Sequence, residues 1–569
     1  MAVAERYEDK IVLATEFREK EMVKLVPGSR WDTVAQVWWV PLSWAACVQL
    51  RGVFGTALQV GENLHQWARA EMQTRIAPCN ELRVADDSED LAFLTTLHPF
   101  QRAGVKFLAT AGHALIADEM GLGKTVQAIA ALEVLGDAAY PALIVCPNSM
   151  KLLWAEEFKR WAPGREPIVI AGTADKRKKA IALLASGEAN VGIINYEGLR
   201  SHTRLEGYGS VVLSDDEKVP KELNAVPFKS VVADEAHRLK DPRAKQTRAM
   251  WYMGRAAEYR FALTGTPIAN SPEDIWTLMR FVSPAEFPAK TKFIERYALQ
   301  SWNVFGFMQV VGIKGETRDE LFKILDPRFI RRTKAAVLPQ LPPKTYATRY
   351  CDMVPKQKKV YEEMRKEQMA ELETGVLLAT NPLVKLTRLL QFASAYGSLD
   401  EAGKLLLTEP SCKVDALEEI VGELGDQQAV VFAESRQLIE LAAARLAKGG
   451  HKIGQITGLI PAHDRATNVQ AFQEGKLKLL LLTLGAGGEG LTLTAASTAI
   501  FLQRSYSYVK NLQAEDRIHR IGQADNVTII DLLTADSVEA RVHASGVYKA
   551  DIAEEITRDE ATVKAWLSK

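Results

Sequence analysis

The stretch ALIADEMGLGKTVQAIAALEVL, residues 114–135, decides the fold of this chain. Its first four residues are apolar and suit a buried strand, whereas residues 125–135 have the pattern of a helix. Between the two, Gly121 and Gly123 let the backbone turn tightly with its N–H groups pointing inward. A strand, a glycine-containing loop and a helix N-terminus together form a binding site for an anion such as phosphate.

The loop also carries the side chains that a nucleoside triphosphate needs. Lys124 is placed to neutralise the β and γ phosphates, and Thr125 to bind Mg²⁺ through its hydroxyl. The strict pattern G-x-x-x-x-G-K-[ST] is not met, because Asp118 stands where its first glycine belongs. An ordinary capped turn is the alternative to a phosphate loop. The residues that we predict to bind ATP here are Gly121, Leu122, Gly123, Lys124 and Thr125.

A pair of adjacent carboxylates forms the second half of this predicted site. The apolar run at 231–233 predicts a strand that delivers Asp234 and Glu235 at its end. Asp234 suits Mg²⁺, and Glu235 suits the orientation and polarisation of the attacking water. An isolated Asp-Glu pair is usually a solvated turn, but this one follows the phosphate loop by about 110 residues in the same α/β region. We therefore interpret Lys124, Asp234 and Glu235 as catalytic.

Gln101 lies just upstream of the loop. Its side-chain amide offers a donor and an acceptor, which suits the edge of an adenine ring. The alternative is a glutamine at the start of a helix with no ligand.

Short apolar runs alternate with helical patterns in two parts of the chain. The first part extends from about residue 91 to 333, and the second from 429 to about 534. Such alternation predicts two α/β lobes, each a parallel sheet covered by helices on both faces. The predicted strands lie at 114–117, 142–146, 191–194, 230–233 and 260–263 in the first part, and at 429–432, 477–483, 499–502 and 527–533 in the second.

Composition sets further bounds. The 569 residues include 71 basic and 71 acidic side chains, so the global charge argues neither for nor against binding of nucleic acid. The five cysteines are scattered without the close pairs of a zinc site, which fits a reducing compartment. We find no pattern of a signal peptide and no stretch near the roughly 18 apolar residues of a membrane span. We expect a cytoplasmic protein that has no membrane partner.

Six motifs together resemble the Swi/Snf-type ATPases of helicase superfamily two. Their order and approximate spacing are those of that family over about residues 95 to 535. Asp118 belongs to the family's form of the phosphate loop, so the departure described above supports the resemblance. The motifs are DEMGLGKT (118–125), DEAHRLKD (234–241), LTGTPIAN (263–270), RRTK with LPPK (331–344), GAGGEGLTLTAAS (485–497) and QAEDRIHRIGQ (513–523).

The resemblance implies two RecA-like lobes, with ATP and Mg²⁺ in the cleft and duplex DNA lying across both. It implies that Arg517 and Arg520 reach the nucleotide from the second lobe as arginine fingers, the alternative being a solvated, salt-bridging face. It also implies that residues 263–267 couple hydrolysis to lobe movement, with Thr264 and Thr266 serving in that coupling or as contacts to DNA phosphates. Gly490 would allow a close approach to the nucleotide or to a DNA phosphate, or else form a structural turn.

The predicted fold is α/β, with two RecA-like parallel-sheet lobes, helical insertions and a small N-terminal α+β module. The predicted parts are a substrate-recognition module at 1–85, a first lobe at 86–333 with a helical insertion at 271–330, a linker at 334–350, a second lobe at 351–535 with a helical protrusion at 354–425, and a helical brace at 536–569.

The N-terminal module is rich in tryptophan, with five of the eleven in its first 67 residues. In a strand at 37–42, Trp38 and Trp39 point to opposite faces, so they cannot both enter one core. One is then free to stack on unpaired bases, with Lys24 and Arg30 near it. The alternative is that the tryptophans build the module's own core and its dock on the motor.

Local signals in the module predict a second strand at 22–26 and a helix that begins after Ser43, which suits an N-cap. A strand–turn–strand module of this kind is similar to the fork-recognition region of annealing helicases. We expect from this likeness that residues 1–85 contact forked DNA.

The leading hypothesis is an ATP-driven duplex-DNA translocase that remodels or anneals branched or forked DNA. A chromatin or protein–DNA complex remodeller ranks lower, because no bromodomain or chromodomain is recognisable. A non-catalytic DNA-binding scaffold is the third hypothesis. The presence of all four main catalytic candidates argues against it, namely Lys124, Asp234, Glu235 and Arg520. The expected partner is duplex DNA, together with forked or single-stranded DNA, and a monomer is favoured over an oligomer.

Overall fold

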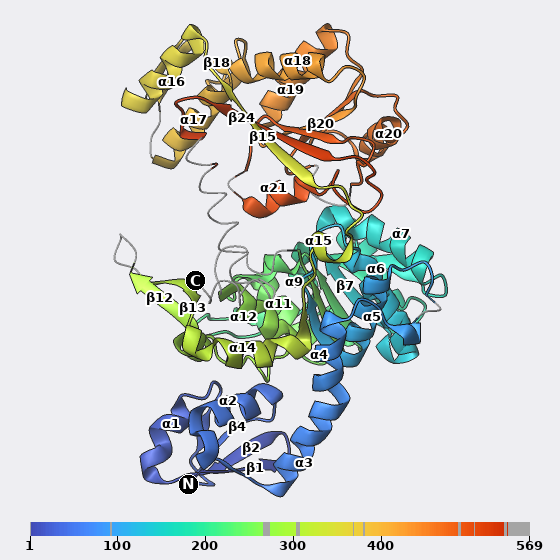
Figure 1. Cartoon of the computed structure of the whole chain (residues 1–569), viewed down its shortest axis with the longest axis vertical. Helices are drawn as coiled ribbons and strands as arrows, with labels where there is room; N and C mark the ends of the chain where they lie inside the picture. Colours follow the sequence, from blue (N-terminus) through green and yellow to red (C-terminus); the bar gives the residue numbers. More distant parts are fainter. Residues whose placement is uncertain are drawn as a thin grey trace. The chain divides into compact units, whose positions relative to one another are not determined.

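A computed structural model describes residues 2–91, 94–265, 273–302, 308–367, 369–378, 382–486, 491–505, 507–539 and 543 (Figure 1). The described chain forms two compact units, one that ends at Val337 and one that begins at Leu338. The first unit contains the N-terminal module together with the first predicted lobe, and the second contains the second predicted lobe.

The N-terminal module is a five-stranded sheet whose apolar face is covered by α2 (Trp44–Phe54), with further side chains of the same core from neighbouring helices. The predicted N-cap is confirmed, because the Ser43 hydroxyl accepts a hydrogen bond from the Ala46 N–H over 3.2 Å. The predicted strand at 22–26 is wrong, since helix α1 (Lys20–Lys24) stands there. The sheet has the order β3-β4-β2-β1-β5, with β1 (Val3–Tyr7), β2 (Lys10–Ala14), β3 (Arg30–Asp32), β4 (Val37–Pro41) and β5 (Gln59–Val60).

Helix α2 lies between the module's sheet and the first lobe (Figure 1). Leu50 on one side of the helix belongs to the module's core, whereas Ala45 on the other side belongs to a core of the lobe. The Gln49 amide donates to the Tyr297 hydroxyl over 3.0 Å, and that hydroxyl donates to Glu320 over 2.6 Å. The module is therefore docked on the lobe by a buried polar chain as well as by apolar contacts.

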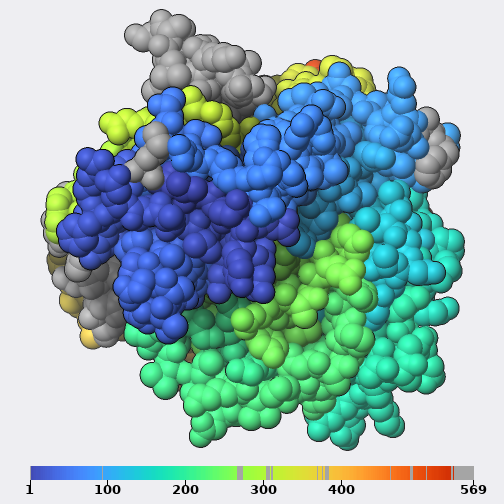
Figure 2. Space-filling view, turned by 90° about the horizontal axis from the view of Figure 1, so that it is seen from below, coloured from blue at the N-terminus to red at the C-terminus, as the bar shows by residue number. Residues whose placement is uncertain are grey.

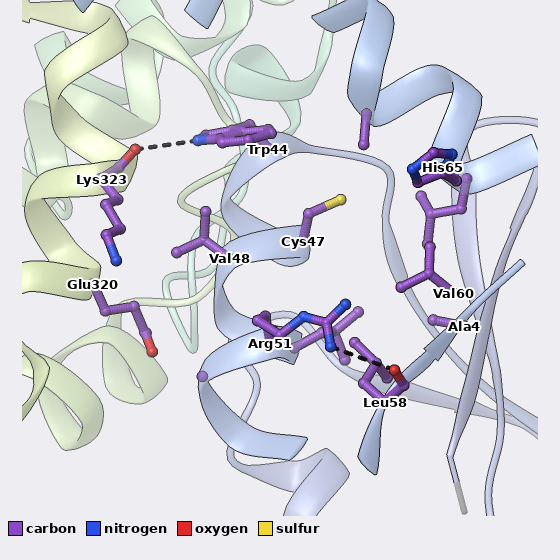
Figure 3. Close-up of a pocket in the computed structure, with 14 residues that line it drawn as sticks. Ala4, Trp44, Cys47, Val48, Arg51, Leu58, Val60, His65, Glu320 and Lys323 are labelled. Atoms are coloured by element: carbon purple, nitrogen blue, oxygen red, sulfur yellow. Dashed lines mark hydrogen bonds between the residues drawn. The ribbon is translucent and has the colours of Figure 1, made fainter. Parts of the chain in front are cut away.

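A cavity of about 450 Å³ adjoins this dock, between α2, α3 (Glu62–Glu71) and α14 (Arg318–Leu325) (Figure 3). At its edge the Trp44 indole donates to the Lys323 carbonyl over 3.2 Å. Trp44 is thus a docking tryptophan, in keeping with one of the two roles expected for this group.

One continuous helical segment leads from the module into the lobe. It comprises α3, a π-helical turn at Met72–Ile76 and α4 (Ala77–Val84). Pro78 has no N–H to donate and its ring crowds the preceding turn, which explains why the hydrogen bonding widens here. The Ala77 N–H accordingly bonds to the Met72 carbonyl, five residues back.

The first lobe is built on a seven-stranded parallel sheet in the order β14-β6-β11-β10-β7-β9-β8. All five strands predicted for this part are confirmed. The strands are β6 (His113–Ile116), β7 (Ala142–Cys146), β8 (Pro167–Val169), β9 (Val191–Asn195), β10 (Ser230–Asp234), β11 (Tyr259–Leu263) and β14 (Phe329–Ile330).

Helices cover both faces of this sheet, as Figure 1 shows, and each face has its own apolar core. On one face lie α5 (Pro99–Ala111), α6 (Lys124–Leu135) and α7 (Lys151–Trp161). On the other lie α8 (Ala174–Ser186), α9 (Tyr196–His202), α11 (Lys245–Gly254) and α12 (Glu273–Val282).

The insertion predicted at 271–330 as helical is only partly so. Besides α12, α13 (Lys290–Tyr297) and α14, it contains an antiparallel hairpin of β12 (Ala298–Trp302) and β13 (Met308–Ile313). It also ends in β14, which pairs with β6 and so belongs to the lobe's own sheet.

The second unit has a six-stranded parallel sheet in the order β15-β24-β23-β20-β22-β21. The four predicted strands are confirmed, in β20 (Ala429–Ala433), β22 (Leu479–Thr483), β23 (Thr498–Phe501) and β24 (Val527–Thr534), and β21 (Ile453–Ile456) is added. Helices α18 (Cys412–Glu423) and α19 (Arg436–Lys448) pack on one face, and α20 (Ala462–Gln473) and α21 (Tyr508–Glu515) on the other.

The predicted linker and the predicted helical protrusion both need correction. The linker predicted at 334–350 contains a short helix, α15 (Lys334–Val337), and most of β15 (Lys344–Cys351), an edge strand paired with β24. The protrusion predicted at 354–425 as helical contains α16 (Pro355–Glu367) and α17 (Pro382–Ser394) but also two hairpins, β16 (Met369–Leu372) with β17 (Gly375–Leu378) and β18 (Tyr396–Leu399) with β19 (Leu405–Thr408). The brace predicted at 536–569 lies almost entirely outside the described residues.

Candidate nucleotide-binding site

The phosphate loop joins β6 to α6 through two glycines in the left-handed region, Gly121 with φ +84° and Gly123 with φ +76°. A side chain at position 123 would also collide with the amide of Gln101, so glycine is required there on two counts. Gly123 is the N-cap of α6, and the helix begins at Lys124. The loop therefore leads its backbone directly into a helix N-terminus, which favours an anion.

Lys124 turns back over this loop. Its ammonium donates to the carbonyl of Asp118 over 2.8 Å and to that of Glu119 over 3.3 Å. Because both acceptors are backbone carbonyls, the position of the ammonium follows the path of residues 118–119.

Gln101 holds the loop from helix α5. Its carbonyl oxygen accepts from the His98 N–H over 3.0 Å, and its amide donates to the Leu122 carbonyl over 3.1 Å. The side chain is buried, and both ends of the amide are in hydrogen bonds within the chain. Its role toward adenine stays a prediction, whereas its contact with the loop is a structural role that the sequence did not indicate.

The carboxylate of Asp234 lies at the end of β10. It accepts from the Trp154 indole over 2.8 Å and from the Glu235 N–H over 2.9 Å. The Tyr196 hydroxyl donates to the Asp234 carbonyl over 2.6 Å, which fixes the backbone at the same point. Burial, together with the nearby charge of Glu235, raises the pKa of Asp234 to about 7, although the Trp154 hydrogen bond and Lys124 act in the opposite direction.

Glu235 follows with a left-handed backbone, φ +48° and ψ +49°, which is uncommon for a residue other than glycine. Its Oε2 lies 3.1 Å from Nδ1 of His237, and that nitrogen lies 3.4 Å from the hydroxyl of Thr264. Strained backbone of this kind clusters at active sites, ligand-binding sites and switch regions. The chain Glu235–His237–Thr264 thereby links the acidic pair to the start of the LTGTPIAN motif.

Parallel pairing brings these pieces to one edge of the sheet. Asp234 is in register with Leu263, and Leu263 with Ile116, so β10, β11 and β6 end side by side. Ligands of open α/β sheets bind outside the carboxyl ends of the strands. The structure thus assembles the loop, the acidic pair and Thr264 where a nucleotide is expected, while Thr266 lies outside the described residues.

The donor set at this edge fits Mg²⁺ bound together with a nucleotide. Among the residues that the structure describes, no group of three or more His, Cys, Asp or Glu side chains is arranged to hold a metal ion by itself. Mg²⁺ is usually held by one or two carboxylates plus substrate phosphates, not by an all-protein cage. Asp234 and the hydroxyl of Thr125 are the groups that would hold it here.

In the second unit, Arg517 and Arg520 follow the end of α21 and lie in turns, not on a helix. Both guanidinium groups donate to the carbonyl of Leu491 over 3.3 Å. Arg517 is buried and Arg520 half-buried, so neither belongs to a solvated helix face. Their action as arginine fingers stays a prediction, and Gly490 lies outside the described residues.

The turn that carries these arginines is anchored by ion pairs that the sequence did not reveal. Glu515 binds Arg504 over 2.6 Å, and Asp516 binds Lys344 over 2.9 Å. These two carboxylates hold the pKa of the half-buried Lys344 above its ordinary value, against the opposing effect of its partial burial. The QAED part of the motif is therefore structural, and it positions the arginines that follow.

Comparison with known proteins places these motifs in families. The SNF2-related domain matches residues 100–395, and the helicase conserved C-terminal domain matches residues 412–522.

No helix of the described residues is long and apolar enough to span a membrane.

Among the relatives, the mouse DNA annealing helicase and endonuclease ZRANB3 is 29% identical over 80% of this chain and 40% of that protein. The Schizosaccharomyces pombe chromatin structure-remodeling complex subunit snf21 is 30% identical over 77% of this chain and 37% of that protein. The chain thus spans less than half of the length of either. Among solved structures, the Sulfolobus solfataricus SWI2/SNF2 ATPase core in complex with dsDNA matches 81% of this chain and 92% of its own, with 23% identity and a TM-score of 0.38.

Proposed function

This chain belongs to the SNF2-related family of helicase-like ATPases, and on that premise we propose that it hydrolyses ATP in response to duplex DNA in order to remodel or anneal branched and forked DNA. The proposal includes action as a monomer in the cytoplasm. The observation that carries it is the meeting of the phosphate loop and the Asp234–Glu235 pair at one edge of the first sheet.

The side chains at this edge divide the work of phosphoryl transfer. Lys124, which donates to carbonyls of its own loop, is the cation for the β and γ phosphates. Glu235 is aimed by its left-handed backbone and by His237, and it polarises the attacking water. Mg²⁺, when bound by Asp234 and Thr125, supplies positive charge that offsets the charge of the phosphates. Arg517 and Arg520 add positive charge from the second unit.

The similarity to known proteins does not distinguish a DNA annealing helicase from a chromatin-remodelling subunit. One of them is an annealing helicase and another a remodelling subunit, and their identities to this chain differ by one percentage point. The choice therefore depends on what precedes the motor. Here that part is a docked module whose sheet has one solvent-exposed face.

Trp39 lies on that exposed face of the module. Val12 and Arg30 pair with it in the neighbouring strands, and the Lys10 ammonium and the Arg30 guanidinium lie 4.7 and 5.3 Å from the centre of its ring. Trp38 points the other way, where it packs against the module's core and meets Trp31 at 5.4 Å.

Two cations, Lys10 and Arg30, lie beside the Trp39 ring on this face, and the carboxylate of Asp32 accepts hydrogen bonds from the backbone N–H groups of residues 34 and 35. Glu5 lies on the same face, opposite Val12, so the support for a nucleic acid is the pair of cations at the ring and not the net charge of the face. Figure 2 is seen from the module's side and shows the blue module turned toward the viewer. We assign the Trp39 face to unpaired bases at a fork, which stack on aromatic rings while cations hold their phosphates.

The test is the ATPase rate with no DNA, single-stranded DNA, duplex and forked DNA in parallel, with Lys124→Ala as the background. We expect slow turnover alone, strong stimulation by duplex and the strongest by forked DNA. Full stimulation by single-stranded DNA alone would exclude a duplex translocase. Equal rates under all four conditions would exclude a DNA-dependent ATPase.

A further inference from the structure

Asp118, which stands where a strict phosphate loop has glycine, is fully buried and bound by Arg332. The Arg332 Nε donates to Oδ1 of Asp118 over 3.0 Å, the Arg332 backbone N–H donates to the same oxygen over 3.0 Å, and Nη2 reaches Oδ2. Two donors of the guanidinium, Nε and Nη2, therefore bind one carboxylate, an arrangement that lysine cannot reproduce.

The remaining donors of Arg332 tie the loop to both helices beside it. Nη2 also donates to the side chain of Gln127 on α6 over 2.7 Å, and Nη1 donates to the Phe100 carbonyl on α5. The guanidinium lies over the Phe100 ring, with its central carbon 5.2 Å from the ring centre. A side chain at Gly104 would lie 2.6 Å from Nη2, so glycine there leaves room for the arginine.

The backbone on either side of Arg332 runs along the start of the loop. The Ala117 N–H donates to the Ile330 carbonyl over 2.8 Å, and the Glu119 N–H donates to the Arg332 carbonyl over 2.9 Å. The Glu119 carboxylate in turn accepts from the Lys334 N–H over 2.7 Å. Residues 117–119 are thus held on one side by the segment that leaves the first unit at Val337.

The same residues hold Lys124 on their other side. The Lys124 ammonium bonds to the carbonyls of Asp118 and Glu119. Arg332 and the phosphate-binding lysine therefore meet through a single dipeptide, with Arg332 on its side chain and Lys124 on its carbonyls.

We propose that Arg332 is a positioning residue for nucleotide binding, which fixes the Asp118–Glu119 dipeptide and thereby the place from which Lys124 meets the phosphates. The inference depends on the proposed function, since it concerns the same site. It explains why this loop carries an aspartate in place of glycine, because the Asp118 carboxylate is the group through which Arg332 binds the loop. Arg332 itself touches no phosphate in this assignment.

The experiment uses Arg332→Lys in the full chain. This change keeps the positive charge but removes the planar guanidinium and its paired donors. A matched control is Arg328→Lys. Arg328 is also buried, lies four residues earlier and binds Glu286 over 2.8 Å, but it contacts the start of β6 and not the loop. The readouts are the Kd of a non-hydrolysable Mg·ATP analogue, the KM and kcat of ATP hydrolysis, and the Tm.

We expect Arg332→Lys to raise both the Kd and KM for nucleotide by about tenfold, while its Tm falls no further than that of Arg328→Lys. The control should keep KM within about twofold of the wild type. A merely structural role would instead lower the Tm and the active fraction at unchanged KM. That result, or an equal rise of KM in the control, would overturn the inference.

A second variant covers the case in which Arg332→Lys does not fold. Asp118→Asn with Arg332→Gln replaces the buried ion pair by a neutral pair, which avoids an unpaired charge. We expect this double variant to fold and to retain a raised Kd for the analogue, whereas a wild-type Kd would overturn the inference. If the wild type bound no analogue, or if Lys124→Ala bound it equally well, the proposed function itself would fail. If Lys124→Ala lost analogue binding while both Arg332 variants bound it like the wild type, only the role assigned to Arg332 would fail.

Discussion

The Trp154 indole N–H donates to Oδ2 of Asp234 over 2.8 Å, and both side chains are buried. Trp154 comes from α7 on one face of the first sheet and meets the end of a central strand. A donor at this point stabilises the charged form of a carboxylate that burial pushes toward its neutral form. With the proposed function, Trp154 would therefore keep Asp234 available as a ligand for Mg²⁺.

Trp154→Phe should weaken the response of the ATPase to Mg²⁺. A hydrogen bond to a charged group is worth about 1.5–3 kcal/mol, so we expect the half-saturating Mg²⁺ concentration to rise by roughly tenfold at pH 7. The difference should shrink as the pH is raised above 7, because Asp234 then becomes increasingly ionised in both proteins. Trp161→Phe is the control, because that indole lies on the same helix and donates to Glu157 instead. Identical Mg²⁺ titrations for Trp154→Phe and the wild type would refute this role.

Asp234 should also make the stability of the first unit depend on pH. Its folded pKa of about 7 lies above the unfolded value, so the folded state binds the proton more tightly. The associated stability is present in full below the unfolded pKa and is lost as pH rises through about 7.

Asp234→Asn removes this dependence. Measured in EDTA, the Tm of Asp234→Asn minus that of the wild type should be larger at pH 8 than at pH 5. One pKa unit corresponds to about 1.4 kcal/mol, and 1 kcal/mol moves the Tm of a large domain by roughly 2–4 °C, so we expect a change of several degrees. The same Tm difference at both pH values would show that Asp234 is already ionised at pH 5.

Much of this fold could be predicted because its strands carry a local signal. Ala142–Cys146 and Ser230–Asp234 are short apolar runs, as expected for central parallel strands buried on both faces. Most of the strand Lys344–Cys351 falls in the predicted linker at 334–350, because an edge strand with mostly exposed side chains lacks such an apolar run. The pairing of β12 with β13 is also not predicted from the sequence, since Leu299 and Trp302 of β12 are exposed and that strand has no buried apolar run.

The residues of the candidate site also fall into those with a local sequence signal and those without one. Lys124 and the Asp234–Glu235 pair lie in contiguous motifs, whose chemistry follows from the residues themselves. Trp154 and Arg332 could not be assigned, because their partners are 80 and 214 residues away in the sequence. Only the meeting of strand ends in the folded sheet shows these contacts.

Glu235→Gln and Lys124→Ala should fail at different steps. Glu235→Gln keeps the cation for the phosphates but loses the carboxylate that polarises water, so it should bind ATP and hydrolyse it very slowly. Lys124→Ala loses the charge that faces the phosphates and should abolish turnover. Nucleotide binding by fluorescence and single-turnover hydrolysis separate the two effects. A wild-type rate in Glu235→Gln would remove that residue from the chemistry.

Arg520→Ala should leave ATP binding nearly intact and lower the hydrolysis rate by a factor in the roughly 10³–10⁵ range of arginine fingers. Arg517 is more buried and shares the Leu491 carbonyl with Arg520, so Arg517→Ala should also lower the Tm of the second unit. The measurements are single-turnover rates with saturating ATP and duplex DNA. Normal turnover in both variants would leave the two arginines a structural role only.

The opposite orientations of Trp38 and Trp39 give the sharpest test of the N-terminal module. Trp38→Ala removes packing from the module's core and should lower the Tm, with effects on forked and duplex DNA alike. Trp39→Ala removes a half-exposed ring from the outer face and should change the Tm little. Base–aromatic stacking is worth about 1–3 kcal/mol per base, so its affinity for forked DNA should fall by roughly 5- to 100-fold.

Continuous duplex is the internal control for Trp39→Ala, because its bases are stacked on one another and cannot stack on the ring. Affinity for duplex and duplex-stimulated ATPase should therefore stay near the wild type. Deletion of the whole module is a poorer test, since it would leave Tyr297 without the Gln49 amide that now donates to its hydroxyl. If Trp39→Ala weakened duplex and fork binding equally, the face would be a general contact for DNA. If it weakened neither, the ring would serve only as a support for Lys10 and Arg30, and the assignment to unpaired bases would be wrong.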